Sequence, residues 1–388
     1  MRPAPPSELG FDSQRLARVA AAIDGDIARE QYDGAVALVA RRGAVVLHEA
    51  FGFANRDAAR PAHCDDVFGL FSITKTLTAV TVLARIERGE LALTTPVADV
   101  IPEFGNRGKQ RITIFQLLTH TSGLAAAMPP IPPELMGNLD ATIAAICEQG
   151  LDARPGTVCN YSALSAHALL AEIVRRLDGR ERRFRDILAD EVLRPLKMTD
   201  TWLGARPDLA ARRVPIVIRD RSPGLFPPEA LEALNDVVNH EAEIPGGGAF
   251  ATAADLARFA EMLRRGGELD GARILSPAMV RLATTNHTGT RPNLLWSYAR
   301  EMRAGWDDFP ANIGLTFWLR GEGVFPTPFG TLASPGTFGH CGASTTTYWV
   351  DPARELVFVL LTAGGIEETR SMERFQRLSD LVHAAVVD

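Results

Sequence analysis

The first fifty residues carry two hydrophobic patterns, one helical and one extended. Apolar residues recur at helical spacing through residues 16–23, and Asp12 or Ser13 stands where a helix N-cap is expected. Two apolar runs follow at residues 34–40 and 44–48, with a short glycine-containing link between them. The pattern predicts one helix followed by a β-hairpin with a tight turn.

The middle of the chain, from residue 72 onward, is mostly helical in its spacing of apolar residues. A run over residues 76–88 ends at Gly89, a residue typical of a helix C-terminus. Loops rich in proline and glycine separate the helical segments. Further helices are predicted near residues 139–149, 162–178, 183–194, 252–265 and 276–284.

Strand signals return near the other end of the chain. They are predicted at residues 313–319, 345–350 and 355–361, before a last helix near residues 366–386. Strands at both ends with helices between them predict an α+β fold, in which both ends build one antiparallel sheet flanked by the first and last helices. Residues 1–75 and 290–388 would form this sheet domain, and residues 76–289 a mostly helical one. An active site is expected where the two meet.

Composition and charge narrow the class of protein. With 46% hydrophobic residues among 388, the chain can bury a sizeable core, and its net charge of −6 comes from interspersed acids and bases. No basic stripe indicates a nucleic-acid partner, and no apolar run of about 18 residues indicates a membrane span. The chain starts without the apolar core of a secretory signal, so a cytoplasmic protein is expected. The histidines and the four scattered cysteines lack metal-ligand spacing, so we expect reduced thiols and neither metal nor cofactor.

The most informative pair of residues is Ser72 and Lys75. Of 41 basic residues only three are lysine, and one of these lies three positions after a serine at the start of a predicted helix. Arginine cannot lose its proton in a protein, whereas a desolvated lysine can, so lysine alone of the two can serve as a base. Spacing of three places Ser72 Oγ and Lys75 Nζ on one helix face. The alternative is a capping serine with a surface lysine.

Two further segments carry candidate chemistry. Tyr161 follows a proline-glycine turn and precedes a helix, where its phenol could reach a serine; a nearby ammonium would lower its pKa, and the alternative is a buried tyrosine. Residues 338–344 form the second segment, in which small residues let a substrate approach a strand edge. There the Ala343 N–H could join an oxyanion site, Gly342 leaves room, and His340 could bind substrate or have a structural role.

These segments occur in an order that resembles the serine β-lactamase and penicillin-binding-protein superfamily, and most of all its class C β-lactamase-like family VIII carboxylesterases. Three motifs carry the likeness over nearly the full chain: Ser72-x-x-Lys75, Tyr161-Ser162-Ala163 and His340-Cys341-Gly342. Supporting segments are similar as well: Leu117-Leu118-Thr119-His120-Thr121-Ser122-Gly123-Leu124, Pro245-Gly246-Gly247-Gly248 and Trp349-Val350-Asp351-Pro352.

The resemblance implies a β-lactamase-like fold and specific roles. Ser72 would be the nucleophile, Lys75 its activating partner, and Tyr161 the general base that passes the proton to the leaving group. The N–H groups of Ser72 and Ala343 would form the oxyanion hole, with substrate also bound at Gly342.

Two substrate-binding positions depart from the β-lactamase pattern. His340 stands in place of a lysine, and Ala163 in place of an asparagine. A histidine is mostly neutral near pH 7, so both changes, like the missing export signal, weaken a β-lactamase or carboxypeptidase interpretation.

We therefore expect a serine hydrolase that cleaves small-molecule carboxylic esters through an acyl-enzyme. Alternatives are an amidase, β-lactamase or D-aminopeptidase-like hydrolase, an acyltransferase, and an inactive ligand-binding homologue; the oligomeric state is left open. A conventional α/β-hydrolase is disfavoured because the chain has no G-x-S-x-G elbow, and His120 and Ser122 are interpreted as turn-stabilising residues. Aromatic residues from the long loops are candidates for either the pocket wall or the core: Phe226, Trp296, Tyr298, Trp306 and Phe325.

Overall fold

The computed structural model describes residues 1–303, 306–343 and 345–388. Within this part, a sheet of eight strands forms the centre of the molecule, and seven of them follow the order β1-β3-β2-β13-β12-β11-β10, with β4 paired to β3. Their bounds are β1 (Arg2–Pro3), β2 (Gly34–Arg41), β3 (Ala44–Asn55), β4 (Arg60–Pro61), β10 (Trp318–Leu319), β11 (Phe338–Gly342), β12 (Thr346–Asp351) and β13 (Leu356–Ala363).

The two ends of the chain meet in the middle of this sheet. β2 and β13 are antiparallel over their full lengths, from the pair Arg41 and Leu356 to the pair Gly34 and Ala363. β2 also forms the predicted hairpin with β3. The prediction of one antiparallel sheet built from both chain ends is confirmed, apart from the short β1, which runs parallel to β3.

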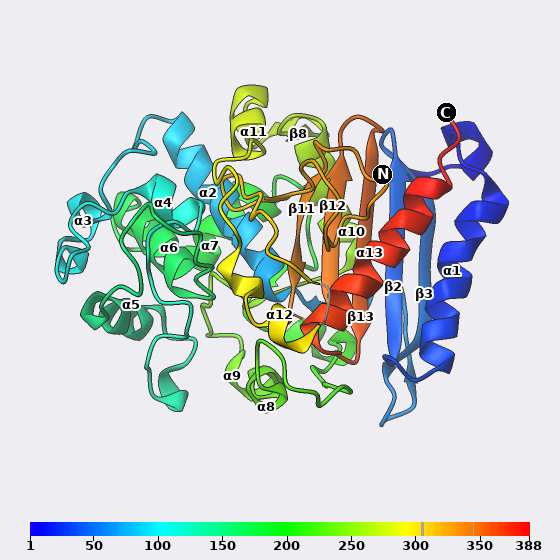
Figure 1. Ribbon diagram of the computed structural model, residues 1–388, viewed down its shortest axis with the longest axis horizontal. Helices are drawn as coiled ribbons and strands as arrows, with labels where there is room; N and C mark the ends of the chain where they lie inside the picture. Colours follow the sequence, from blue (N-terminus) through cyan, green and yellow to red (C-terminus); the bar gives the residue numbers. More distant parts are fainter. Residues whose placement is uncertain (304–305, 344) are drawn as a thin grey trace.

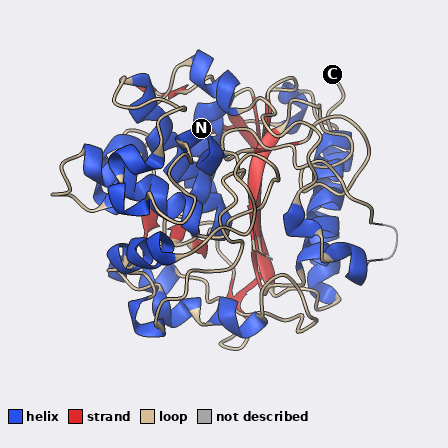
Figure 2. Ribbon diagram, turned by 60° about the vertical axis from the view of Figure 1, so that its left-hand side comes forward, coloured by secondary structure: helices blue, strands red, loops and turns tan. Residues whose placement is uncertain are grey.

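Alternating side chains place helices on both faces of the sheet. The first helix α1 (Ser13–Ala28), capped by Asp12, and the last helix α13 (Glu368–Ala384) share one hydrophobic cluster with Val39 and Phe358. The helix α10 (Ala253–Arg264) packs in a second cluster, with Leu38 and Val359. Figure 1 shows α1 and α13 side by side along the sheet, and Figure 2 shows the sheet edge-on between helical layers.

Most of the remaining helices lie beside the sheet, on the side where α2 (Thr74–Glu87) runs, and the α2 residues from Thr74 to Arg85 are all buried (Figure 1). In the described ranges, no helix has both the length and the apolar character needed to cross a membrane. The other helices are α3 (Val97–Val100), α4 (Ile114–Leu118), α5 (Leu139–Glu148), α6 (Ser165–Leu177), α7 (Phe184–Leu188), α8 (Pro228–Glu232), α9 (Leu234–Val237), α11 (Pro277–Ala283) and α12 (Ala299–Met302). Short strands complete the fold: β5 (Phe68–Gly69), β6 (Trp202–Leu203) and β7 (Ala249–Ala251) pair as one sheet, and β8 (Glu268–Leu269) pairs with β9 (Ala272–Arg273).

One predicted strand is largely wrong. Of residues 313–319, only Trp318 and Leu319 form a strand, β10, at the edge of the sheet. The preceding residues make a turn in which the Gly314 N–H donates to the Phe317 carbonyl, and Thr316 has a left-handed φ of +76°. That φ is incompatible with extended backbone, whatever the alternation of apolar residues suggests.

The boundaries between a sheet domain and a helical domain stay a prediction. Helix α10 lies within the predicted helical segment, yet it packs against β2, β12 and β13. One hydrophobic cluster joins residues of α2 and α6 to residues of the sheet, among them Leu83, Leu169 and Val359. The two parts therefore share a continuous core.

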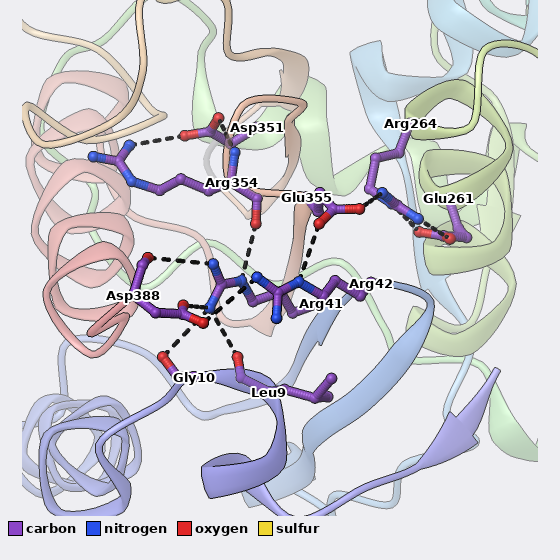
Figure 3. Close-up of polar contacts among 10 residues, drawn as sticks. All are labelled: Leu9, Gly10, Arg41, Arg42, Glu261, Arg264, Asp351, Arg354, Glu355 and Asp388. Atoms are coloured by element: carbon purple, nitrogen blue, oxygen red, sulfur yellow. Dashed lines mark hydrogen bonds and ion pairs between the residues drawn. The ribbon is translucent and has the colours of Figure 1, made fainter.

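A polar network fastens both ends of the chain to the end of the central hairpin (Figure 3). The buried guanidinium of Arg41 donates to the carbonyl oxygens of Leu9 (2.8 Å) and Arg354 (3.0 Å), and it forms an ion pair with the Asp388 side chain. These half-buried carbonyl groups are satisfied by this donor, and an unpaired polar group withdrawn from water is costly. Further ion pairs extend the network to α10: Arg42 with Glu355, Arg264 with Glu355, and Arg264 with Glu261.

Candidate active site

Ser72 lies at the junction of the sheet and the helical part, half-buried in a 3-10 turn (Phe71–Ile73) that leads directly into α2. The predicted place of Ser72 at the start of a helix is thus confirmed. Phe71, immediately before it, has a left-handed φ of +47°. Non-glycine residues with such backbone occur mostly in turns and sites that the surrounding structure holds firmly. The turn directs Ser72 toward the end of β11.

Lys75 is fully buried and lies within hydrogen-bonding distance of the serine. Its Nζ is 3.0 Å from Ser72 Oγ and donates to the carbonyl oxygen of Gly246 at 2.6 Å. Burial favours the neutral amine and lowers the pKa of Lys75 from its usual 10.5 to about 7. Near pH 7 an appreciable fraction of the protein therefore has a neutral amine within hydrogen-bonding distance of the serine hydroxyl.

The glycine-rich segment before β7 holds the lysine side chain. The Thr78 hydroxyl donates to the Pro245 carbonyl (2.8 Å), one turn of α2 beyond the bond from Lys75 to Gly246. A methyl group on Gly246 would lie 3.1 Å from the Ala163 carbonyl oxygen, closer than most side-chain contacts. This segment was noted in the sequence because it is similar to a segment of the family. That the Gly246 carbonyl holds Lys75 was not predicted.

Tyr161 is buried beside these two residues and lines the same pocket as Ser72. Lys75 Nζ lies 5.0 Å from the centroid of the tyrosine ring. The expectation that a nearby lysine lowers the pKa of this phenol is wrong. Burial raises the pKa of Tyr161 by more than the nearby Ser72 side chain lowers it, so the residue is a neutral phenol at physiological pH.

The end of β11 approaches the nucleophile turn so closely that only glycine fits. A methyl group on Gly342 would lie 2.4 Å from the Leu70 carbonyl oxygen and 2.3 Å from Thr346 Oγ1. Gly342 therefore brings Ala343 to the same pocket as Ser72. Ser344, the last residue of the motif, lies outside the described residues.

His340 and Ala163 are buried and do not line this pocket. The His340 ring lies 5.0 Å from Trp318 and 6.3 Å from Tyr161, and its Nδ1 donates to the Cys341 carbonyl at 2.7 Å. Burial lowers the pKa of His340 to about 3, so the ring is neutral. That these two residues contact substrate therefore stays a prediction. The contacts of the His340 ring with Trp318 and Tyr161 were not expected from the sequence.

The pocket beside Ser72 is narrow and largely apolar, with about 40 Å³ of free space. Among the described residues that line it, Glu368 carries the one charge, and its carboxylate accepts the Leu225 N–H at 2.9 Å. The lining residues are Ser72, Tyr161, Leu225, Phe226, Leu295, Trp296, Trp318, Cys341, Gly342, Ala343, Glu368, Ser371, Met372 and Phe375.

The predicted aromatic residues divide between pocket and surroundings. Phe226 and Trp296 line the pocket, whereas Tyr298 and Trp306 pack against Trp296, at 6.1 and 6.2 Å between ring centroids. Phe325 lines a second, smaller cavity of about 20 Å³.

A wall of three side chains separates the pocket from this second cavity. Trp296, Trp318 and Met372 line both spaces. Sequence reasoning missed Trp318 and Met372 as pocket residues. The first follows a turn that the apolar pattern concealed, and the second belongs to a helix that looked like an ordinary cover of the sheet.

Fold and site together define a hydrolase of the β-lactamase fold. The Beta-lactamase family model matches residues 19–381, nearly the whole chain. The protein therefore belongs to the beta-lactamase family, within the superfamily of serine β-lactamases and penicillin-binding proteins.

Individual relatives agree with this placement. Esterase EstB of Burkholderia gladioli is 29% identical over 388 residues, covering 92% of this chain and 93% of the relative. A penicillin-binding protein homologue from Caulobacter crescentus superposes with a TM-score of 0.78 at 27% identity, covering 97% and 99% of the two chains. A family VIII carboxylesterase shares the fold with a TM-score of 0.74 at 21% identity, over 96% and 98%.

Proposed function

We propose that the protein hydrolyses small carboxylic esters through an acyl-enzyme on Ser72. The observation that carries the proposal is the 3.0 Å approach of Lys75 Nζ to Ser72 Oγ at the edge of an apolar pocket. A buried amine with a pKa of about 7 can accept the hydroxyl proton at physiological pH. Similarity to an esterase over nearly the full chain supports the same reaction class.

The reaction would begin when the neutral amine of Lys75 takes the proton of Ser72 and Oγ attacks the ester carbonyl. The backbone N–H groups of Ser72 and Ala343 would stabilise the oxyanion. As the bond to the leaving oxygen breaks, Tyr161 would donate its phenolic proton to that oxygen and recover a proton from the Lys75 ammonium. Attack of water on the acyl-enzyme would then release the acid and restore Ser72.

The lining residues and the size of the pocket favour neutral esters over substrates that carry a free carboxylate, such as β-lactams and peptides. Among the described residues that line the pocket there is no lysine or arginine that could bind a substrate carboxylate. The neutral ring of His340 supplies no cation in the place where the family often has lysine. The limited free space beside Ser72 favours short acyl groups.

Mass spectrometry of the intact protein tests the nucleophile. After incubation with a fluorophosphonate, a single adduct mapped to Ser72 is expected, and Ser72→Ala should lose both the adduct and the turnover of p-nitrophenyl acetate. Ser122→Ala is the matched control, since Ser122 is buried in the turn after α4 and does not line the pocket beside Ser72. An adduct on another residue, or full turnover by Ser72→Ala, would overturn the proposal.

The substrate class is tested with a chromogenic cephalosporin and an added alcohol. Turnover of short esters without turnover of the cephalosporin is the expected result. Faster turnover of the cephalosporin would favour an amide hydrolase. Acylated alcohol in place of free acid would favour an acyltransferase.

A further inference from the structure

His120, in the loop that follows α4, contacts three consecutive residues around Tyr161. Its backbone carbonyl accepts the N–H of Asn160 at 2.9 Å, and its ring nitrogen Nδ1 accepts the N–H of Ser162 at 3.2 Å. Between these bonds, the imidazole stacks on the Tyr161 ring, with centroids 4.4 Å apart and planes inclined by 28°. A single residue thus holds the backbone on both sides of the tyrosine, and its side chain covers one face of the ring.

The local structure indicates that His120 does more than fill space in the core. The residue is fully buried, with a left-handed φ of +54°, a conformation that costs free energy for a residue other than glycine. Because the Ser162 N–H points at Nδ1, the proton of the neutral ring lies on Nε2. Burial also lowers the pKa of His120 well below its usual value, which keeps the Nδ1 lone pair available as an acceptor.

The place of Tyr161 in the active site explains why these contacts from His120 matter. Tyr161 lines the same pocket as Ser72, and the Lys75 amine lies 5.0 Å from the ring centroid. A rotation about χ1 of Tyr161, or a shift of its backbone, would move the hydroxyl away from the leaving oxygen, and misplacement by about 1 Å can reduce a rate by about 100-fold. The backbone bonds and the stack both oppose that displacement.

We propose that His120 is a positioning residue that holds Tyr161 for proton delivery to the leaving group. The proposal rests on the proposed ester hydrolysis and adds to it a residue that touches neither Ser72 nor the reacting atoms. In the step concerned, the carbon–oxygen bond to the leaving group breaks and the proton of Tyr161 passes to that oxygen. Esters with poor leaving groups need this proton, whereas p-nitrophenolate departs readily as an anion.

The test compares two acetate esters with the same acyl group, p-nitrophenyl acetate and ethyl acetate. His120→Phe keeps an aromatic ring but loses the acceptor for Ser162. His120→Asn offers Oδ1 in place of Nδ1 and tolerates left-handed backbone, but it loses the stack. Tyr161→Phe removes the phenolic proton altogether and so gives the largest effect that loss of proton delivery can have. His167→Asn is the matched control, since the buried His167 hydrogen-bonds to Thr316. Phosphonate titration counts active sites, so rates refer to folded enzyme.

The expected result is a change in leaving-group preference. The ratio of kcat/KM for ethyl acetate to that for p-nitrophenyl acetate should fall about 100-fold or more in Tyr161→Phe, at least about tenfold in His120→Phe, and less in His120→Asn. It should stay within about twofold of the wild-type ratio in His167→Asn. If His120→Phe does not fold, the comparison is made with His120→Asn alone. A wild-type ratio in the His120 variants that fold, with both rates reduced in parallel, would overturn the proposal. Wild-type enzyme that cleaves neither ester would instead refute the proposed function.

Discussion

The buried amine of Lys75 makes the stability of the fold depend on pH in a direction that can be worked out. Its pKa in the folded protein is about 7, below the usual 10.5, so between these values the unfolded chain binds more protons and stability rises with pH. The full shift of the Lys75 pKa lowers the free energy of unfolding by about 5 kcal/mol at low pH. About 2–3 kcal/mol of this change occurs between pH 6.5 and pH 9. Lys75→Met has similar length and no charge, so it removes this dependence.

We therefore expect Lys75→Met to gain stability relative to the wild type as the pH falls. The difference in the free energy of unfolding, variant minus wild type, should be about 2–3 kcal/mol more positive at pH 6.5 than at pH 9. Loss of the hydrogen bond to Gly246 lowers the stability of the variant at both pH values and cancels in this comparison. The same variant should lose ester hydrolysis.

Urea unfolding at 25 °C, followed by tryptophan fluorescence, measures this difference. Lys197→Met is the control for loss of one lysine charge, since Lys197 is exposed. A difference between Lys75→Met and wild type that is equal at pH 6.5 and pH 9 would show that the folded protein does not depress the pKa of Lys75. The role of this lysine as the base would then have to be abandoned.

Three further substitutions test the pocket and the fold. Gly342→Ala should slow phosphonate labelling of Ser72 by at least about tenfold, because β11 must move away from the nucleophile turn; unchanged labelling would contradict this. Met372→Ala should open the wall to the second cavity and raise the kcat/KM ratio of hexanoate to acetate p-nitrophenyl esters about tenfold, whereas a ratio like that of Met279→Ala would contradict it. Arg41→Met should reduce the free energy of unfolding by about 2–4 kcal/mol in urea, and a loss below about 1 kcal/mol would show that the network of Figure 3 contributes little.

The features that could be predicted from the sequence depend on local spacing or on repeated apolar patterns. The hairpin of β2 and β3, the helix after Ser72 and the two last strands follow from periodicities of two and of 3.6. The approach of Lys75 to Ser72 follows from a spacing of three on one helical turn. Pairing of β2 with β13 could be expected because both runs are apolar on both faces and need neighbours.

Features set by tertiary contacts could not be predicted in this way. The turn at Gly314 and Thr316 is hidden because Ile313, Leu315 and Phe317 alternate like a strand. The pKa of Tyr161 depends on how deeply the residue is buried, which overrides the effect of the nearby lysine. The contacts of His120 involve backbone groups about 40 residues away along the chain, and no periodicity reveals such contacts.

Burial of Lys75 both destabilises the fold and makes the site reactive. At pH 7 a lysine with the usual pKa of 10.5 would be neutral in only about one molecule in three thousand, whereas a pKa of about 7 gives roughly half. The free energy of about 5 kcal/mol that this costs must be offset by the apolar contacts of α2, whose residues from Thr74 to Arg85 are all buried. A site on a solvent-exposed helix could not hold the amine neutral. The central position of α2, between the sheet and the other helices, is therefore a requirement of the proposed chemistry as well as of the fold.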